Sequence, residues 1–268
     1  MQRFALGIEY DGSAYHGWQR QQDGVRSIQE ELEKALSQIA NEPIELVGAG
    51  RTDKGVHALE QVAHFDTRAQ RTTYNWRRGL NALLPKTITV RWVQEVGEKF
   101  HARFSAQRRC YRYFIHNSPD KPALFHQQLG WEYRPMKLAP MQKAADYLLG
   151  THDFSAFRAA DCQAQSPVKT LERLQVFQRG HLWMIEAQAD GFLMHMVRNL
   201  TGTLVAVGTG ERSPEWALEV LRSKDRRQAG IAAPAKGLFM HWVEYGPEFY
   251  LPQQRGELLF WPEGTLGK

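Results

Sequence analysis

The chain has 268 residues, of which 43% are hydrophobic and 24% are charged, close to the average of globular proteins. This size and composition exclude a peptide, a fibre and a disordered chain, and no apolar run approaches the roughly 18 residues that span a bilayer. The formal net charge of +5, from 34 Lys and Arg against 29 Asp and Glu, favours a polyanionic partner. The first residues lack the apolar stretch of a signal peptide, so we expect a cytoplasmic protein without a membrane segment.

The first part of the chain is predicted to contain six elements. Alternating apolar residues indicate a strand over residues 4–10, and the capping box of Ser27 and Glu30 indicates a helix over 28–39. The later predicted elements are strands over 44–47 and 61–65, a helix over 72–84 and a strand over 88–93. The resulting order β-α-β-β-α-β is that of the ferredoxin-like split βαβ unit.

The second part shows a similar order of elements without a repeat at the level of residues. The predicted elements are a strand over 111–116, a helix over 138–149, strands over 171–177 and 182–187, helices over 192–207 and 214–221, and a strand over 238–245. Ser213 is expected to cap the second of these later helices, with Pro214 at its first position. We therefore predict an α+β fold of two ferredoxin-like halves, residues 1–105 and 106–268, whose antiparallel sheets flank a central basic cleft.

Two segments are rich in cations and contain no acidic residue. Residues 99–112 hold five cations, interleaved with aromatic residues, and residues 68–78 hold four. Positive charge that alternates with stacking surface is typical of nucleic-acid binding. The alternative is that both segments are ordinary solvated faces of helices and strands.

The cysteines and histidines do not predict a metal centre. Cys110 and Cys162 are too far apart in sequence for a metal knuckle or a CxxC pair, and no HExxH motif is present. We interpret four histidines as packing or surface residues: His57, His64, His195 and His241.

Residues 48–58, GAGRTDKGVHA, are the most informative stretch. The segment opens with GxG after a predicted strand, as a dinucleotide-binding fingerprint does. That fingerprint is excluded, because the charge of Asp53 would oppose a pyrophosphate and no amphipathic helix follows. Residues 52–55 also suit an ordinary turn. The neighbouring Arg51 and three glycines, in a chain biased towards nucleic acid, favour a carboxylate that acts as nucleophile or base.

Eight motifs occur in order along the chain. They are YDG (10–12) with GWQRQ (17–21), GRTD (50–53) with GVHA (55–58), NALLP (81–85), FHARF (100–104), YRY (111–113), DFSAF (153–157), F (192) with MVRN (196–199), and GLF (237–239). Together they resemble the tRNA pseudouridine synthase A family, and the similarity extends from residue 4 to about residue 245. The chain departs from the family pattern at Lys54, where a small residue is usual, and at Cys110, where a basic residue is common.

The resemblance implies a role for each matching residue. Asp53 matches the catalytic aspartate, which attacks the target uridine without metal or cofactor, and Arg51 helps to extrude the base. Tyr111 matches the tyrosine that packs on the flipped uracil, Arg198 matches the arginine that pairs with the aspartate, and Leu238 falls near the base. The family acts as a homodimer on tRNA, at positions 38–40 on the 3′ side of the anticodon stem-loop.

The chemistry of this reaction fits a site without a cofactor motif. The isomerisation breaks the C1′–N1 bond and rejoins the base at C5, so no redox partner is needed. Extruding the base costs a few kcal/mol, of which stacking on a tyrosine returns about 1–3 kcal/mol.

Alternatives stay open: Tyr111 could belong to a sheet core with Tyr113, and the protein could be a non-catalytic RNA-binding module or an Asp-dependent nucleotide hydrolase. Arg198 lies in an apolar helix, where its charge needs an anionic partner.

Overall fold

The computed structural model describes residues 1–22, 24–252 and 261, and the chain divides into two compact units. Unit 1 comprises residues 1–107 and the described residues from 240 onward, and unit 2 comprises residues 108–239. This division differs from the predicted domains 1–105 and 106–268, because the last strand returns to the first unit. There the Tyr245 hydroxyl donates to the carbonyl of Ala102 at 2.6 Å, and the Tyr245 ring lies 5.1 Å from that of Phe100.

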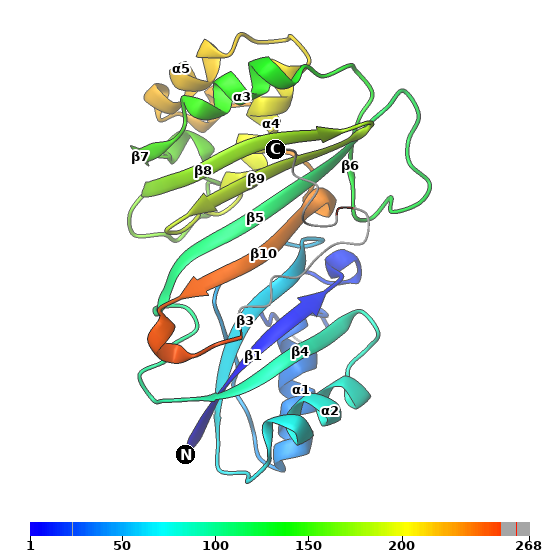
Figure 1. Ribbon diagram of the computed structural model, residues 1–268, viewed down its shortest axis with the longest axis vertical. Coiled ribbons are helices and arrows are strands. Elements are labelled where there is room, and N and C mark those ends of the chain that lie inside the picture. Colours follow the sequence, from blue (N-terminus) through cyan, green and yellow to red (C-terminus); the bar gives the residue numbers. More distant parts are fainter. Residues whose placement is uncertain (23, 253–260, 262–268) are drawn as a thin grey trace. The chain divides into compact units, whose positions relative to one another are not determined.

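Unit 1 is built on a sheet with the strand order β4-β1-β3-β10 (Figure 1). Its strands are β1 (Gln2–Tyr10), β2 (Val47–Gly48), β3 (His57–Thr67), β4 (Ile88–Val96) and β10 (Leu238–Tyr245), of which Leu238 and Phe239 belong to unit 2. Its helices are α1 (Ile28–Ala40) and α2 (Thr73–Leu83). Strand β1 runs antiparallel to β3 and β4, and β2 runs antiparallel to β3. The predicted order β-α-β-β-α-β is therefore present in unit 1.

Local signals set the limits of the unit 1 elements. The Ser27 hydroxyl accepts from the amide of Glu30 at 3.3 Å, which confirms the predicted N-cap of α1. The strand predicted over 44–47 is reduced to Val47–Gly48. The reason is that the amides of Ile44 and Leu46 donate to the side chains of Ser37 and Glu33 on α1 instead of to a neighbouring strand.

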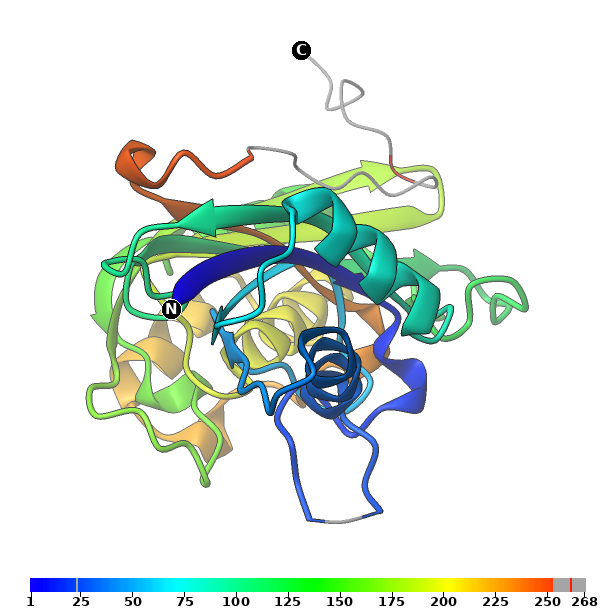
Figure 2. The same ribbon diagram turned by 90° about the horizontal axis from the view of Figure 1, so that it is seen from below.

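The core of unit 1 is an aromatic cluster between the sheet and the helices. The ring of Phe65 lies 5.6 Å from that of Phe4 and 5.1 Å from that of Trp76 on α2, and all three side chains are buried. Asn81 joins the same helix to β4, because its side chain donates to the carbonyl of Val90 and accepts from the amide of Val90. Helices α1 and α2 contact each other beside β1 (Figure 2).

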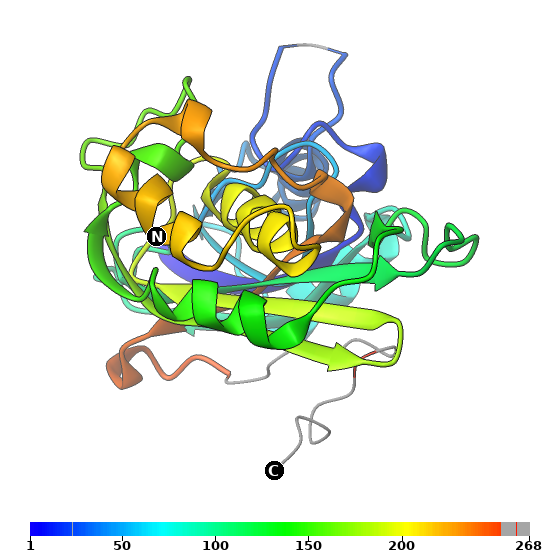
Figure 3. The same cartoon turned by 90° about the horizontal axis from the view of Figure 1, so that it is seen from above.

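Unit 2 has a sheet with the strand order β5-β9-β8-β7, and β6 pairs in parallel with β5. Its strands are β5 (Ala106–Asn117, which starts within unit 1), β6 (Gly130–Glu132), β7 (Gly150–Asp153), β8 (Val168–Arg179) and β9 (Leu182–Ala189). Its α-helices are α3 (Leu138–Asp146), α4 (Met196–Gly208) and α5 (Glu215–Ser223). Helices α4 and α5 lie on the same side of β8 and β9 (Figure 3).

Short 3-10 helices complete the described structure: η1 (Gly12–Ala14), η2 (Ser155–Phe157), η3 (Arg226–Gln228), η4 (Ala235–Gly237) and η5 (Pro247–Phe249). Two predicted helix starts shift. Helix α4 begins at Met196 instead of residue 192, because His195 adopts a left-handed conformation with φ 62°. Helix α5 begins at Glu215 with Pro214 as its N-cap, one residue later than predicted. Within the described ranges, no helix is long and apolar enough to cross a membrane.

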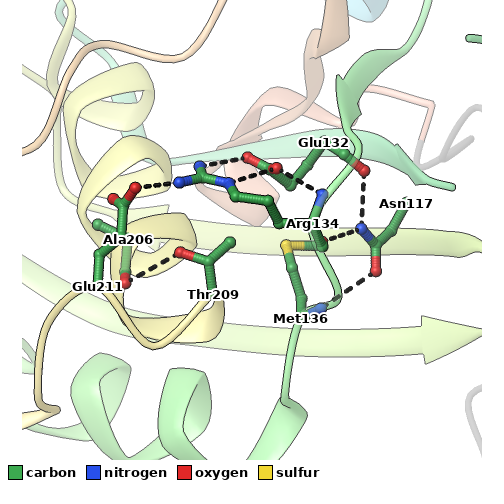
Figure 4. Close-up of polar contacts among 7 residues, drawn as sticks. All are labelled: Asn117, Glu132, Arg134, Met136, Ala206, Thr209 and Glu211. Atoms are coloured by element: carbon green, nitrogen blue, oxygen red, sulfur yellow. Dashed lines mark hydrogen bonds and ion pairs between the residues drawn. The ribbon is translucent and has the colours of Figure 1, made fainter. Parts of the chain in front are cut away.

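A polar network fixes the chain that follows β6 (Figure 4). Arg134 forms ion pairs with Glu132 on β6 and with Glu211, which lies beyond the end of α4. The side-chain amide of Asn117 on β5 donates to the carbonyls of Glu132 and Arg134 at 2.7 Å each, and its oxygen accepts from the amide of Met136. The network therefore ties the segment to both β5 and the end of α4.

His64 on β3 is buried against the loop that follows β4. Its side chain is 5% exposed, and its Nδ1 accepts from the amide of Ala102 at 3.2 Å. Burial, helped by the nearby charges of Arg3 and His101, lowers the pKa of His64 to about 4. The neutral ring is therefore the form that the folded chain keeps.

We predict that His64 makes the protein less stable in mild acid. Between pH 6.5 and about pH 4 the unfolded chain binds a proton that the folded chain does not, so the free energy of unfolding falls as the pH is lowered. In His64→Gln this fall should be smaller, because glutamine still accepts from Ala102 but does not titrate. Urea unfolding at several pH values measures it, with the exposed His126→Gln as control. An unchanged pH dependence in His64→Gln would contradict the prediction.

Candidate active site

The start of the loop between β2 and β3 is fixed onto β3 by two hydrogen bonds. The amide of Ala49 donates to the carbonyl of Val62 at 2.7 Å, and the side-chain amide of Gln61 donates to the carbonyl of Gly50 at 2.7 Å. Gln61 is fully buried, so its hydrogen bond is shielded from competing water. The residues that lead to Arg51 therefore have a defined backbone path.

Asp53 begins a tight turn over residues 53–56, one residue later than the turn predicted over 52–55. The amide of Val56 donates to the carbonyl of Asp53 at 3.1 Å, and Gly55 has φ +78°, a conformation that favours glycine. Thr52 is buried, and its hydroxyl lies 2.8 Å from the hydroxyl of Tyr10 on β1. Asp53 is half-buried and Arg51 is exposed. The turn thus holds a partly accessible carboxylate between two buried residues, Thr52 and Val56.

The segment after β1 supports this turn from the outside through two glycines. The amide of Trp18 donates to the carbonyl of Thr52 at 3.0 Å. A Cβ atom at Gly17, which has φ +99°, would lie 2.4 Å from that same carbonyl oxygen, and one at Gly12 would lie 1.9 Å from the carbonyl oxygen of Val56. The motifs at 10–12 and 17–21 are therefore the surface against which the loop packs.

His57 links the same segment to the start of β3. The side chain is buried, and its Nδ1 lies 3.1 Å from the amide nitrogen of Gly12 and 3.2 Å from Oδ1 of Asp11. The contact with His57, together with hydrogen bonds from Ser13, holds the pKa of the Asp11 carboxyl well below its usual range. His57 thus has the packing role that the sequence analysis proposed.

Tyr111 lies on β5 of unit 2 in an aromatic environment. It is mostly buried, and its ring is 5.1 Å from that of Phe192 in an edge-to-face arrangement. Tyr113, two residues further on the strand, donates its hydroxyl to the carbonyl of Pro234 at 2.8 Å. Burial raises the pKa of Tyr113 above its usual value, and the positive charge of Arg198 opposes this change. The sequence allowed both tyrosines to belong to the sheet core. Tyr113 does lie in this core, since its side chain is buried.

Arg198 lies on α4 and is bound to the segment that precedes η4. Its Nε donates to the carbonyl of Ala233 at 2.8 Å, and the amide of Ala233 donates back to the carbonyl of Arg198 at 3.0 Å. The next residue, Asn199, is buried and donates to the carbonyl of Phe157 at 2.7 Å. The motifs at 153–157 and 196–199 therefore contact each other, and they fix the orientation of α4 within unit 2.

The predicted site residues thus lie in two local settings. Unit 1 places Arg51 and Asp53 in one supported loop, and unit 2 places Tyr111 on β5 and Arg198 on α4. Leu238, the first residue of β10, is buried. The support that Gln61 and Tyr10 give to the loop was not predicted from the sequence. Tyr10 belongs to the apolar residues of β1 that alternate with small or polar ones, a pattern that indicates only a half-buried strand.

Two cations of the basic segment 99–112 have structural partners. Arg112 and Glu186 are both buried, and their Nε and Oε2 atoms are 2.7 Å apart. Arg108 pairs with Glu172 at 2.7 Å. These two charges are compensated within unit 2, so the composition of the segment overstates the positive charge that a ligand would meet.

Two other features of the described residues bear on a ligand. Within these residues, no group of three or more His, Cys, Asp or Glu side chains is arranged to hold a metal ion. A cavity of about 680 Å³ in unit 1 is lined by residues 94–99 and 248–250. It lies at the other end of β1 from the Asp53 loop, since Arg3 pairs with Val96 whereas Tyr10 pairs with Ile88.

Comparison with known proteins gives consistent matches. The family described as tRNA pseudouridine synthase matches residues 7–105 and 144–246. The chain is 49% identical over 253 residues to tRNA pseudouridine synthase A of Coxiella burnetii, covering 94% of this chain and 97% of that relative. It is 50% identical over 252 residues to the protein of the same name from Pseudomonas aeruginosa, covering 94% and 88%. The corresponding values for Alcanivorax borkumensis are 50% over 254 residues, with 95% of each chain covered.

We predict that Gly17→Ala destabilises the protein much more than Gly24→Ala. Both glycines have positive φ, but an added Cβ meets the carbonyl of Thr52 at Gly17 and nothing within 4 Å at Gly24. Backbone strain alone costs about 1 kcal/mol, and the forced shift of the loop adds roughly 2 kcal/mol more at Gly17. Urea unfolding of both variants measures the difference. Equal losses would show that the loop is not held by this contact.

Proposed function

Because the chain belongs to the tRNA pseudouridine synthase family of isomerases, we propose that it converts uridine to pseudouridine in tRNA, at positions 38–40 of the anticodon stem-loop. The observation that carries the proposal is the supported Asp53 loop, which stands within the matched residues 7–105. A carboxylate that acts on a substrate must keep its position to within a fraction of an ångström. The contacts of Gly12 and Gly17 with the loop supply such a constraint.

We propose Asp53 as the nucleophile and Arg51 as the residue that helps to displace the base from its stack. Tyr111 stacks on the extruded uracil, and Arg198 pairs with the carboxylate of Asp53. Two observations support these roles. Tyr111 already packs edge-on against Phe192, which offers an aromatic setting, and the Nε contact with Ala233 limits the orientations of the Arg198 guanidinium.

The proposed reaction balances without an added reagent. The C1′–N1 glycosidic bond breaks, the base turns, and a C1′–C5 bond forms. The hydrogen at C5 leaves as a proton, and N1 gains one. Asp53 either adds to the ring or acts at C1′ of the ribose, and both routes return the free carboxylate. The proposal therefore includes neither a metal nor a cofactor.

The proposed arrangement has two ferredoxin-like halves with a basic cleft between their sheets, in a cytoplasmic homodimer that binds tRNA. The element order of unit 1 and its antiparallel pairings support the first half. In unit 2, the antiparallel pairing of β5 with β9 and of β8 with β7 and β9 supports the second.

We predict that Asp53→Asn lowers turnover by at least about 10³-fold, because the amide retains the shape of the side chain but not its nucleophilic charge. Tritium release from tRNA labelled at uracil C5 measures turnover, and filter binding should show unchanged tRNA affinity. The exposed Asp161→Asn, which makes the same chemical change elsewhere, should be fully active.

Three results would contradict this assignment, each in a different way. Full tritium release by Asp53→Asn would remove Asp53 from the reaction. Wild-type protein that binds tRNA but leaves every uridine unaltered would be a non-catalytic binding module. Release of free base or phosphate would indicate a hydrolase.

The proposed positions lead to a separate prediction. Wild-type protein should form pseudouridine in a tRNA transcript at uridines 38–40, because the family resemblance places the target there. Chemical mapping of pseudouridine after reaction identifies the modified positions, and a transcript with cytidines at 38–40 is the control. Modification of that control transcript would show that the target lies elsewhere.

A further inference from the structure

Helix α2 contributes Trp76 to the core of unit 1, but most of its residues are exposed or half-buried. Only Trp76 and Leu80 of its eleven residues are buried, whereas Tyr74, Arg77 and Arg78 are exposed. The helix lies within residues 67–94, the longest stretch of the chain without Asp or Glu. This stretch contains six Arg and Lys residues.

Of the six cations of this stretch, Arg91 pairs with a carboxylate and the charge of Arg68 helps to lower the pKa of Glu42, which leaves four to consider. On α1, Lys34 pairs with Glu30 at 2.7 Å, and Arg91 on β4 pairs with Glu9. Within the described residues no carboxylate forms an ion pair with Arg71, Arg77, Arg78 or Lys86. We call these four residues the α2 basic surface.

Hydrogen bonds to uncharged groups restrain three side chains of the α2 basic surface without neutralising them, and the longest joins Arg77 to the carbonyl of Arg91 at 3.5 Å. Arg78 donates to the hydroxyl of Tyr74 at 3.0 Å, one turn earlier on the helix. Arg71 donates to the carbonyl of Gln70 at 3.0 Å. A side chain that is already held loses less conformational entropy when it meets a ligand.

The charge near the start of α2 opposes the helix dipole. Acidic residues in the first turn favour a helix, and α1 and α5 have them as Glu30, Glu31 and Glu215. The first turn of α2 contains no acidic residue, and Arg71 stands directly before the Thr72 N-cap. An anionic ligand would turn this unfavourable arrangement into a favourable one.

The α2 basic surface starts at the same end of unit 1 as the Asp53 loop. Lys86 is followed by Thr87, whose carbonyl accepts from the amide of Asp11 at 2.9 Å and whose hydroxyl lies 2.7 Å from that of Tyr15. The segment 11–15 includes Gly12, which packs on the loop at Val56. From there α2 (cyan in Figures 1 and 2) extends for about 16 Å.

We propose that the α2 basic surface binds the phosphate backbone of the tRNA substrate, beyond the nucleotide that enters the Asp53 loop. This inference rests on the proposed function for the identity of the RNA. Phosphate contacts require positive charge and little shape, and they fix the position of the nucleic acid without reading its sequence. The surface would therefore contribute to affinity for tRNA and not to the chemical step.

The test compares Arg71→Gln/Arg77→Gln/Arg78→Gln with Arg71→Lys/Arg77→Lys/Arg78→Lys. The glutamine variant should raise KM for tRNA by about 10-fold or more at moderate salt, with kcat unchanged. The slope of log affinity against log salt concentration should decrease in magnitude by roughly 2 to 3, as expected for three lost phosphate contacts. The lysine variant keeps the charge and should stay within about threefold of wild type.

Lys34→Gln, which removes a paired cation from α1, should leave both quantities unchanged. Circular dichroism and urea unfolding of the glutamine variant check that it folds. Filter binding is also carried out in the Asp53→Asn background, so that RNA affinity is measured without turnover.

The possible outcomes separate the two proposals. An unchanged KM and salt dependence in the glutamine variant would overturn the surface while leaving the isomerase function intact. If the glutamine variant loses RNA affinity while the wild-type protein, with Asp53 intact, releases no tritium, the surface is supported and the isomerase function is rejected. A changed sedimentation mass with unchanged RNA affinity would mean that the surface binds a second copy of the chain, and this too would overturn the proposal.

Discussion

The contact of two glycines with the backbone of one turn is the constraint on which unit 1 depends. Gly12 and Gly17 approach the carbonyls of Val56 and Thr52 so closely that no side chain fits. The same segment also fixes the start of α1, because the carbonyls of Gly17 and Trp18 accept from the amides of Ile28 and Gln29. The position of the Asp53 carboxylate, the direction of α1 and the end of β1 are therefore coupled, and a change at one glycine reaches all three.

The basic residues of the chain fall into two physical classes. In unit 2, Arg112 is buried with Glu186 and Arg108 is paired with Glu172, so these charges serve the sheet. On α2 the arginines are exposed and lack such carboxylates, so they add to the field outside the protein. The amino-acid composition does not distinguish the paired arginines from the exposed ones. The partners that the fold supplies separate them: the register of β5 with β9 sets Arg112 opposite Glu186, and Arg108 meets Glu172 on β8.

Local patterns predict local structure in this chain, and they fail where a distant group competes. The N-cap of α1 at Ser27 is confirmed, and a turn forms at 53–56, one residue later than predicted, because each depends on neighbours in sequence. The strand over 44–47 is wrong because the side chains of Glu33 and Ser37 take its amides, and β6 and β7 are too short to show a period. Arg51 and Asp53 could be recognised together within one motif. Tyr111 and Arg198, on separate elements, could be chosen only by resemblance.

The return of β10 to unit 1 affects how the chain folds as it is made. Translation proceeds at about 5–20 residues per second, and units whose residues are contiguous fold as they emerge. Unit 1 lacks this advantage, because its part of β10, from Met240 onward, follows all of unit 2 along the chain. Until Tyr245 has been synthesised, Phe100 has no ring from β10 to pack against, and the edge of β3 is covered only by its short pairing with β2. The part of the protein that carries Asp53 is thus begun first and completed last.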